Sequence, residues 1–232
     1  DVELNDPSNW TGTFSDASVG DDKQVTVTGL APDGNDAEYY TVAPYTTEAD
    51  IEKRELTVGG ITAENKVYDG DDEATLGGTA TVGRKIVPED VEVDNSASAR
   101  SLWEGTFSDA SVGDDKQVTV TGLVLKGSDA GNYTIPEEYT TWADITIVEL
   151  TVSGITAENK VYDGDDEATL SGNGSLIGVV GTDDVDLNDS SNWTGTFSDA
   201  DAGSYKTVTV TELDLIGDDA VKYTIAPYTT TA

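Results

Sequence analysis

The stretch WTGTFSDASVGDDKQVTVTGL, residues 10–30, contains two strand patterns on either side of an acidic turn. Trp10 and Phe14, with a glycine midway between them, alternate with threonine and therefore share one face of a strand. Val25 and Val27 alternate with threonine in the same way. The letters VGDD between the two patterns are typical of a turn. The stretch predicts two strands with their large apolar side chains on a common face.

This pattern is part of a long internal repeat. It returns as WEGTFSDASVGDDKQVTVTGL from Trp103 and as WTGTFSDADAGSYKTVTVTEL from Trp193. A second block, ELTVGGITAENKVYDGDDEATL, starts at Glu55 and returns almost unchanged from Glu149, a period of 94 residues. Such a period is too long for a solenoid and suits a small β domain in tandem. We expect the second half of one repeat at 1–54, a complete repeat at 55–148, and a nearly complete repeat without its last strand at 149–232.

Strand patterns follow one another through each repeat. VTVTGL, ELTVSGI and ADITIVEL are rich in Val, Ile and Thr, whereas KGSDAGN, VGTDD and YDGDD mark turns. No window combines a 3.6-residue period with helix caps. We predict an all-β chain of tandem immunoglobulin-like β-sandwich modules, each with about seven to eight short strands. A β-grasp-like module is the alternative.

Three separated blocks carry a family resemblance. ITAENKVYDG…ATL, GTFSDASVG…KQVTVTGL and DAGNYTI…ADIT resemble, in this order, the YDG-type repeat of large bacterial surface proteins and adhesins. The resemblance covers residues 55–232 and the half repeat before them, and it implies extracellular tandem modules without enzymatic activity. DAGNY at 129–133 also resembles the tyrosine corner of immunoglobulin-like sandwiches, in which the hydroxyl bonds to the main chain. Tyr40 and Tyr223 occupy the same repeat position.

The charge balance limits the partners of this chain. It has 46 acidic against 12 basic residues, a net charge of −34, so no basic patch can bind nucleic acid or an anionic membrane surface. It has no Cys and no His, which removes disulfides, thiolate metal sites and the commonest general base. No apolar run approaches the roughly 18 residues of a membrane span.

The acidic stretch KVYDGDDEATL occurs at 66–76 and again at 160–170. Ca²⁺ takes about six to eight oxygen ligands, which such a loop and its carbonyl groups could supply, but the spacing of an EF-hand is absent. We favour a glycine-containing turn whose acids face water and keep calcium binding as the second interpretation. The candidate ligands are Asp69, Asp71, Asp72, Asp163, Asp165 and Asp166.

Other residues suggest modification or packing. Five asparagines lie in N-x-[ST] sequons, which fits glycosylation of a surface protein: Asn9, Asn132, Asn173, Asn188 and Asn192. The tryptophans that open the recurring stretch are expected in the core. Trp142 has no counterpart in the other repeats, and we expect it to pack against the next repeat.

The function predicted from these features is structural. TTWADITIVELTV, residues 140–152, contains no Gly or Pro, so one repeat should run directly into the next with little hinge motion. We predict a non-enzymatic stalk or filament at the extracellular cell surface; the alternative is an adhesive module that binds a glycan or protein through its loops. Because 1–54 lacks the first strands of its repeat, we expect the chain to be a segment of a longer one, or its ends to be completed by neighbouring repeats or copies through strand addition.

Overall fold

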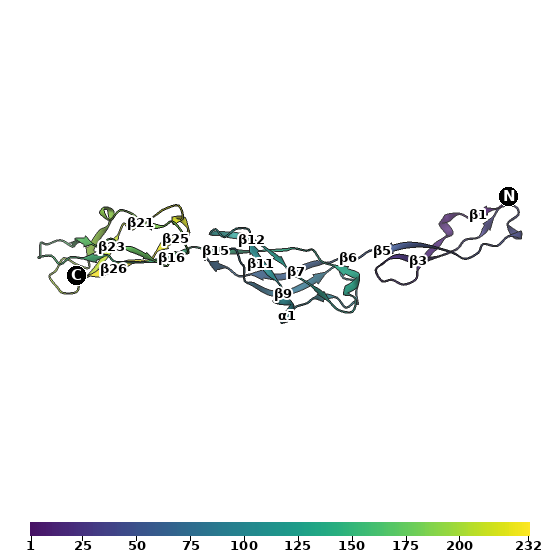
Figure 1. Ribbon diagram of the computed structural model, residues 1–232, viewed down its shortest axis with the longest axis horizontal. Coiled ribbons are helices and arrows are strands. Elements are labelled where there is room, and N and C mark those ends of the chain that lie inside the picture. The colour runs from purple at the N-terminus through teal and green to yellow at the C-terminus, as the bar shows by residue number, and fades with distance from the viewer. The chain divides into compact units, whose positions relative to one another are not determined.

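The computed structural model describes residues 1–232, and its secondary structure is almost entirely β (Figure 1). Strands contain 46% of the residues and helices 8%, so the all-β prediction is confirmed. The α-helix α1 (Ala97–Arg100) is capped by Ser96, whose side chain accepts the N–H of Ala99. No helix is long and apolar enough to cross a membrane. Short 3-10 helices lie at Pro7–Asn9, Ala37–Tyr39, Ala130–Asn132, Ser190–Asn192 and Ala220–Lys222.

Residues 1–54 form one open sheet and a short strand pair. The strands are β1 (Glu3–Leu4), β2 (Thr11–Phe14), β3 (Gly20–Thr28), β4 (Pro32–Asp33) and β5 (Tyr45–Ile51). Antiparallel pairing joins β2 to β3, β3 to β5, and β1 to β4. Val25 is the only buried apolar residue in this part of the chain. An open groove of about 510 Å³ lies over the apolar face, lined by Leu4, Trp10, Val27, Leu30, Val42, Ala43, Pro44 and Tyr45.

The middle repeat is built from ten strands. They are β6 (Arg54–Glu55), β7 (Thr57–Ala63), β8 (Lys66–Val67), β9 (Leu76–Gly83), β10 (Glu92–Val93), β11 (Glu104–Phe107), β12 (Gly113–Thr121), β13 (Leu125–Lys126), β14 (Tyr133–Thr134) and β15 (Tyr139–Thr146). β11, β12, β15 and β8 form a four-stranded sheet in that order. Two pairs are parallel, β6 with β14 and β8 with the end of β15. Each of these parallel pairs therefore joins two strands that are far apart in the sequence of the repeat.

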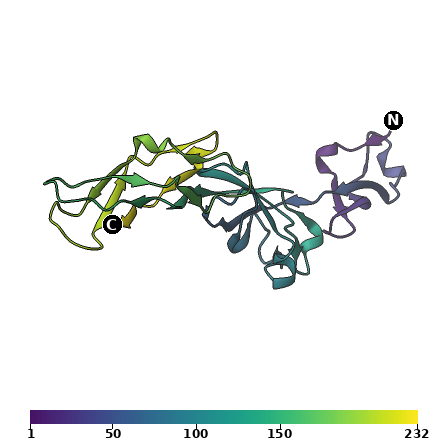
Figure 2. The ribbon, with the colours of Figure 1, turned by 60° about the vertical axis from the view of Figure 1, so that its left-hand side comes forward.

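The last repeat follows the same plan. Its strands are β16 (Val148–Ser153), β17 (Thr156–Ala157), β18 (Glu167–Ala168), β19 (Leu170–Ser171), β20 (Ser175–Ile177), β21 (Asp186–Leu187), β22 (Thr194–Phe197), β23 (Thr207–Thr211), β24 (Leu215–Ile216), β25 (Tyr223–Ile225) and β26 (Tyr228–Thr231). One sheet has the order β20-β16-β25 and another β18-β22-β23-β26. β16 and β25 are parallel neighbours, seen side by side in Figures 1 and 2. Val152 of β16 and Val210 of β23 belong to one core cluster, so the two sheets share a core.

The recurring stretch forms the same hairpin three times. Its glycine faces a valine of the second strand each time, in the pairs Gly12 with Val27, Gly105 with Val120, and Gly195 with Val210. A Cβ atom on Gly105 would lie 2.7 Å from Cδ2 of Leu76, and one on Gly195 would lie 2.7 Å from Cδ2 of Leu170. Glycine at this position therefore makes room for a leucine from the preceding block of the repeat.

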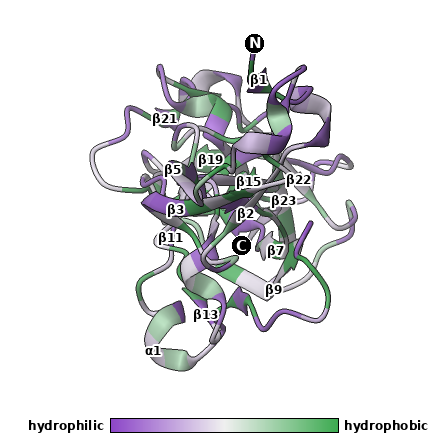
Figure 3. Cartoon of the chain, turned by 90° about the vertical axis from the view of Figure 1, so that its right-hand side faces the viewer, coloured by the Kyte–Doolittle hydropathy of each residue, from purple (hydrophilic) through white to green (hydrophobic).

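Each hairpin turn pairs one of the few lysines with an aspartate. Lys116 Nζ lies 2.7 Å from Asp109 Oδ1, and Lys23 with Asp16 and Lys206 with Asp199 repeat the pair. The bond from Lys116 and the main-chain N–H of Ser111 lower the pKa of Asp109 to about 2. Hydrophilic residues line many of the connecting loops (Figure 3), as the net charge of −34 leads one to expect. The turns thus keep a carboxylate charged beside a cation.

The chain divides into two compact units whose boundary falls inside the middle repeat. The first contains 1–61, 79–102 and 122–139, and the second contains 62–78, 103–121 and 140–232. Leu56, Val91 and Tyr133 form a buried cluster in the first unit, and Val152, Ile155, Leu187 and Val210 form one in the second. The second unit joins three stretches of the middle repeat, 62–78, 103–121 and 140–148, to the whole last repeat.

Candidate functional site

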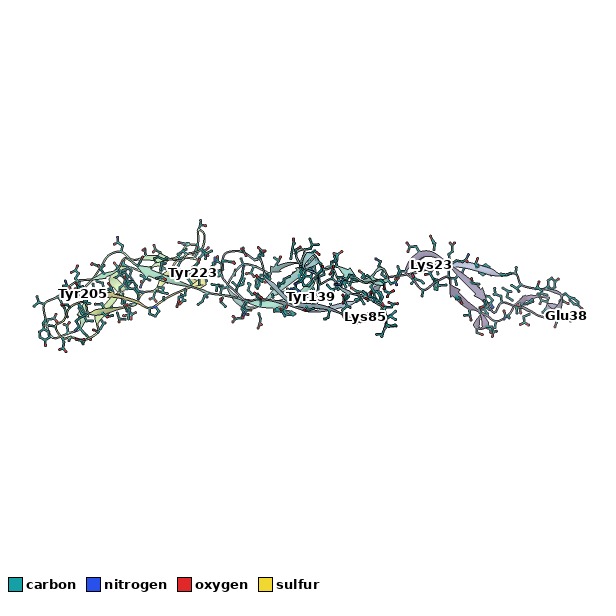
Figure 4. All side chains as sticks on the ribbon, turned by 90° about the horizontal axis from the view of Figure 1, so that it is seen from below. Lys23, Glu38, Lys85, Tyr139, Tyr205 and Tyr223 are labelled. Atoms are coloured by element: carbon teal, nitrogen blue, oxygen red, sulfur yellow. The ribbon has the colours of Figure 1, made fainter.

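The junction between the middle and last repeats is a nearly continuous strand. β15 ends at Thr146 and β16 begins at Val148, so Ile147 alone separates them. Val148 pairs in parallel with Tyr223, the first residue of β25. The pairing brings Tyr223 to the start of the last repeat. This end of the repeat lies opposite the end that carries Tyr205 (Figure 4).

The acidic loop of the middle repeat lies at the same junction. We call residues 66–73 the Tyr68 loop. Lys66 of β8 pairs in parallel with Ile145 of β15, and the N–H of Tyr68 donates to the carbonyl of Thr146 at 2.9 Å. These bonds fix the loop beside the first residues of the last repeat, within one compact unit.

Tyr68 is buried in this junction, with 6% of its surface exposed. Its ring meets the ring of Tyr223 edge to face, with centroids 6.0 Å apart and an interplanar angle of 89°. Lys222 Nζ donates to the Tyr68 hydroxyl at 2.9 Å and lies 4.8 Å from the ring centroid. Aromatic pairs and cation–π contacts of this kind add to the free energy of burial. Tyr68 is therefore a side chain of one repeat held by side chains of the next.

A single carboxylate connects these groups. Asp183 accepts from the hydroxyl of Tyr223 at 2.7 Å, from the hydroxyl of Tyr68 at 3.4 Å, and from Lys222 Nζ at 3.4 Å. The bond to Asp219, and then the bond to Tyr68, raise the pKa of Lys222. Burial, and then the bond to Asp183, raise the pKa of Tyr223 to about 12. The cluster is a satisfied polar network in a largely buried place.

Gly70 allows the loop to approach the last repeat closely. Its backbone angle φ is +89°, a value that residues other than glycine rarely adopt. A Cβ at this position would also lie 3.2 Å from Cγ1 of Val180. The N–H of Val180 donates to the Tyr223 hydroxyl at 3.0 Å, so Val180 belongs to the same cluster. Both the conformation and the close contact favour glycine here.

The middle repeat has a similar tyrosine at its own start. The hydroxyl of Tyr133 accepts the N–H of Ile86 at 3.0 Å and donates to Glu89. Burial, and then the bond to Glu89, raise the pKa of Tyr133. Asn132 stands where the last repeat has Lys222, and its side-chain oxygen accepts the N–H of Val19 at 3.0 Å.

The tyrosine-corner resemblance is correct only in part. Tyr133 starts strand β14, and its hydroxyl does bond to the main chain. The partner lies 47 residues earlier in sequence, in a separate loop, and not a few residues upstream. Tyr40, at the same repeat position, is 60% exposed. The residue therefore ties two loops together at the end of a repeat.

The structure places a lysine inside each acidic loop. Lys66 Nζ lies 2.7 Å from Asp69 and 2.6 Å from Asp71, and it also donates to the carbonyl oxygens of Asp71 and Glu73 at 3.0 and 3.1 Å. Burial lowers the pKa of Lys66, but the bonds to Asp69 and Asp71 outweigh it and leave the pKa raised. The lysine ammonium thus has the oxygen partners that a bound cation would use.

The second acidic loop repeats this arrangement. Lys160 Nζ lies 2.9 Å from Asp163 and also pairs with Asp165. Asp72 and Asp166 are exposed. The structure contains no group of three or more acidic side chains arranged to hold a metal ion. Calcium binding by these loops stays a prediction.

The five sequon asparagines fall into two groups. Asn9, Asn173 and Asn192 are exposed, and Asn132 and Asn188 are half-buried. Asn188 accepts the Trp193 indole N–H at 2.7 Å and donates its amide to the carbonyl of Glu212 at 2.9 Å. A glycan on Asn188 would therefore replace one of the two N–H hydrogens of an amide that takes part in structural bonds. Glycosylation of all five sites stays a prediction.

The tryptophans were predicted with mixed success. Trp103 is 9% exposed, in agreement with a core role, and Trp10 and Trp193 are half-buried. Trp142 is 59% exposed, so the expectation that it packs against the next repeat is wrong. The junction uses Tyr68 instead, because β8 carries that residue to the end of β15.

Comparison with known families gives one match. The sequence profile of the YDG domain matches residues 1–48, 52–141 and 146–232. The chain therefore belongs to the YDG domain family. Searches among curated proteins and among solved structures returned no match.

Three junction residues were not singled out from the sequence: Val180, Asp183 and Lys222. The sequence holds one indication of Lys222, because this residue directly precedes Tyr223, which occupies the position of the tyrosine corner. Nothing in the sequence around Asp183 distinguished it from the other 45 acidic residues.

Proposed function

We propose that this chain is a non-enzymatic structural segment of an extracellular surface protein, in which tandem YDG modules form a stiff stalk or filament. The observation that carries the proposal is the Tyr68 cluster. It joins the middle repeat to the last through an aromatic pair, a cation–π contact and a shared carboxylate. A link of one residue between β15 and β16 also leaves little freedom.

The finer fold belongs to the same proposal. We propose an immunoglobulin-like sandwich for each complete module in preference to a β-grasp. The core cluster shared by the β16 and β23 sheets supports this arrangement. The partners we propose are neighbouring repeats or copies of the chain, and the apolar groove over residues 1–54 supports strand addition there.

Distance measurement between two spin labels tests the stiffness. The chain has no Cys, so labels can be placed on Ser108→Cys in the middle repeat and Ser191→Cys in the last, both exposed positions within the same compact unit. We expect one narrow distance distribution. Tyr68→Ala combined with Lys222→Ala should broaden it, because the cluster then loses both its ring and its cation.

Tyr162→Ala is the matched control, since the same sequence motif carries it and it lies away from this junction. It should leave the distribution narrow. A broad distribution in the unaltered chain would remove the support for a stiff stalk.

An adhesive module that binds a glycan or protein ligand is the second candidate. Exposed tyrosines favour it, because an open aromatic ring can stack on a sugar. Tyr39 and Tyr205 are 75% and 87% exposed. A glycan array probed with the whole chain tests this candidate, and binding that is lost in Tyr205→Ala or Tyr39→Ala would favour it over a purely structural role.

A further inference from the structure

The acidic loop of the last repeat is a copy of the Tyr68 loop in sequence and conformation. We call residues 160–167 the Tyr162 loop. Gly70 and Gly164 have φ values of +89° and +90°. Lys66 lies 5.8 Å from the ring centroid of Phe107, and Lys160 lies 5.8 Å from that of Phe197. The two loops therefore share the same backbone conformation at the glycine and the same contact between lysine and phenylalanine.

The loops differ in what covers them. Tyr68 is 6% exposed and Tyr162 is 66% exposed. A Cβ on Gly70 would meet Val180 at 3.2 Å, whereas one on Gly164 would meet nothing within 4 Å. The Tyr162 loop borders a small pocket of about 110 Å³, whose lining includes Tyr162, Asp165, Phe197, Asp199 and Lys206. An aromatic ring that is buried in one copy is open in the other.

The covering group of the Tyr68 loop defines the chemistry of a partner. It consists of Val180, Asp183, Lys222 and Tyr223. All four lie at the end of the module where the last repeat begins, which we call its first end. The first end of the middle repeat offers an aliphatic residue, an acid and a tyrosine at the matching places, namely Ile86, Glu89 and Tyr133. It has Asn132 in place of the lysine, and an amide cannot supply the cation over the ring.

We propose that the Tyr162 loop is a docking surface for the first end of a further YDG module, one that carries lysine where Lys222 stands. The inference rests on the proposed structural function and names the partner of this second loop. The tyrosine pairs with the partner's tyrosine edge to face, the partner's lysine lies over the ring and binds the hydroxyl, and the partner's acid accepts from both tyrosines. The lysine selects among modules, because the other groups occur at both first ends in this chain.

The test extends the full chain by one module. Residues 144–232 are appended after Ala232, which matches Ala143 in the repeat, so the added strand continues in register. The appended copy carries Tyr162→Phe, so that only the natural Tyr162 gives a peptide with tyrosine at this position. Exposed tyrosines are nitrated with tetranitromethane, and the rate at each site is read by mass spectrometry of peptides. We expect the nitration rate of Tyr162 to fall about tenfold on extension, the ratio of the exposed fractions of Tyr162 and Tyr68. Tyr39, which is 75% exposed, is the internal control and should not change.

Two further extensions test the role of the lysine. One carries Lys222→Asn in the appended copy. The other appends residues 50–143, the middle repeat with its natural Asn132, which guards against a variant that fails to fold. Both should protect Tyr162 much less than the lysine module does. Equal protection by all three would overturn lysine selection.

An unchanged nitration rate of Tyr162 in the lysine extension would overturn the docking proposal as a whole. The rate at Tyr68 separates this failure from failure of the proposed function. If Tyr68 is protected and Tyr162 is not, the docking proposal alone fails. If Tyr68 is nitrated as fast as Tyr39, the junction that supports the structural function fails as well.

Discussion

The Tyr68 loop and the Tyr162 loop have the same eight-residue sequence, yet one tyrosine is 6% exposed and the other 66%. Both loops contain a lysine bound to two aspartates, and both have a glycine near φ +90°. The difference comes from the neighbouring repeat, which covers the Tyr68 loop with Val180, Asp183, Lys222 and Tyr223.

This comparison separates two roles of the same motif. The aspartates and the glycine set the conformation of the loop locally, through Lys66 or Lys160. The tyrosine contributes to stability only where a partner buries it, since a half-open ring gains little from the hydrophobic effect. The motif is thus a preformed turn that presents a tyrosine.

The largest expected difference between the loops is the cost of removing the tyrosine. Tyr68→Ala should lower the free energy of unfolding by about 3 kcal/mol, because it leaves a cavity and removes one hydrogen bond each from Lys222 and Asp183. Tyr162→Ala should change it by less than about 0.5 kcal/mol, as is usual for an exposed side chain. Urea unfolding followed by tryptophan fluorescence measures both. Equal costs would show that Tyr68 is not held by the last repeat.

The second expected effect is a loss of stability at alkaline pH. The folded chain raises the pKa of Tyr223 from 10.0 to about 12, and it also raises the pKa of Lys222. A raised folded pKa contributes stability that is complete below the unfolded value, so this contribution disappears as the pH rises from 10 towards 12. Urea midpoints measured across this range should fall.

A pair of phenylalanine variants assigns this loss to the junction. Tyr223→Phe should flatten the fall, because the titrating hydroxyl is gone. Tyr162→Phe should leave it unchanged. If Tyr223→Phe loses stability over the same range as the unaltered chain, another group causes the effect.

A smaller effect should distinguish the two glycines. Gly164→Ala should cost about 1 kcal/mol from its positive φ alone. Gly70→Ala should cost more, since its Cβ would also press on Val180 at 3.2 Å. Thermal unfolding of the two variants compares them directly. A larger cost at Gly164 would contradict the close contact at the junction.

The smallest expected effect concerns cations. If the lysines occupy the places of a metal, Lys160→Gln should make about 1 mM Ca²⁺ raise the melting temperature more than it does in the unaltered chain. NaCl at equal ionic strength is the control, because screening of the net charge of −34 also stabilises. Should Ca²⁺ do no more than NaCl in both chains, calcium binding by Asp163, Asp165 and Asp166 is excluded.

Much of the fold follows from local pattern in the sequence. Alternation of Trp, Gly and Phe with threonine predicted the hairpins, because successive side chains of a strand point to opposite faces. The repeat implied that they recur, and the register of Gly12, Gly105 and Gly195 against valine does recur. The absence of Gly and Pro from 140–152 predicted a direct link between repeats, and one residue separates β15 from β16.

The sequence by itself determined the repeat, the strands and the conformation of the acidic turns, because these depend on residues close together in the chain. Only the tertiary structure decided which tyrosine is buried and by what. Tyr68 meets Asp183 and Lys222 across 115 and 154 residues of sequence, and no local pattern encodes such a meeting. It results from two parallel strand pairs, β8 with β15 and β16 with β25, which carry residues distant in the chain to one junction. Identical letters at 160–170 therefore give an exposed tyrosine where no second pair of strands delivers a partner.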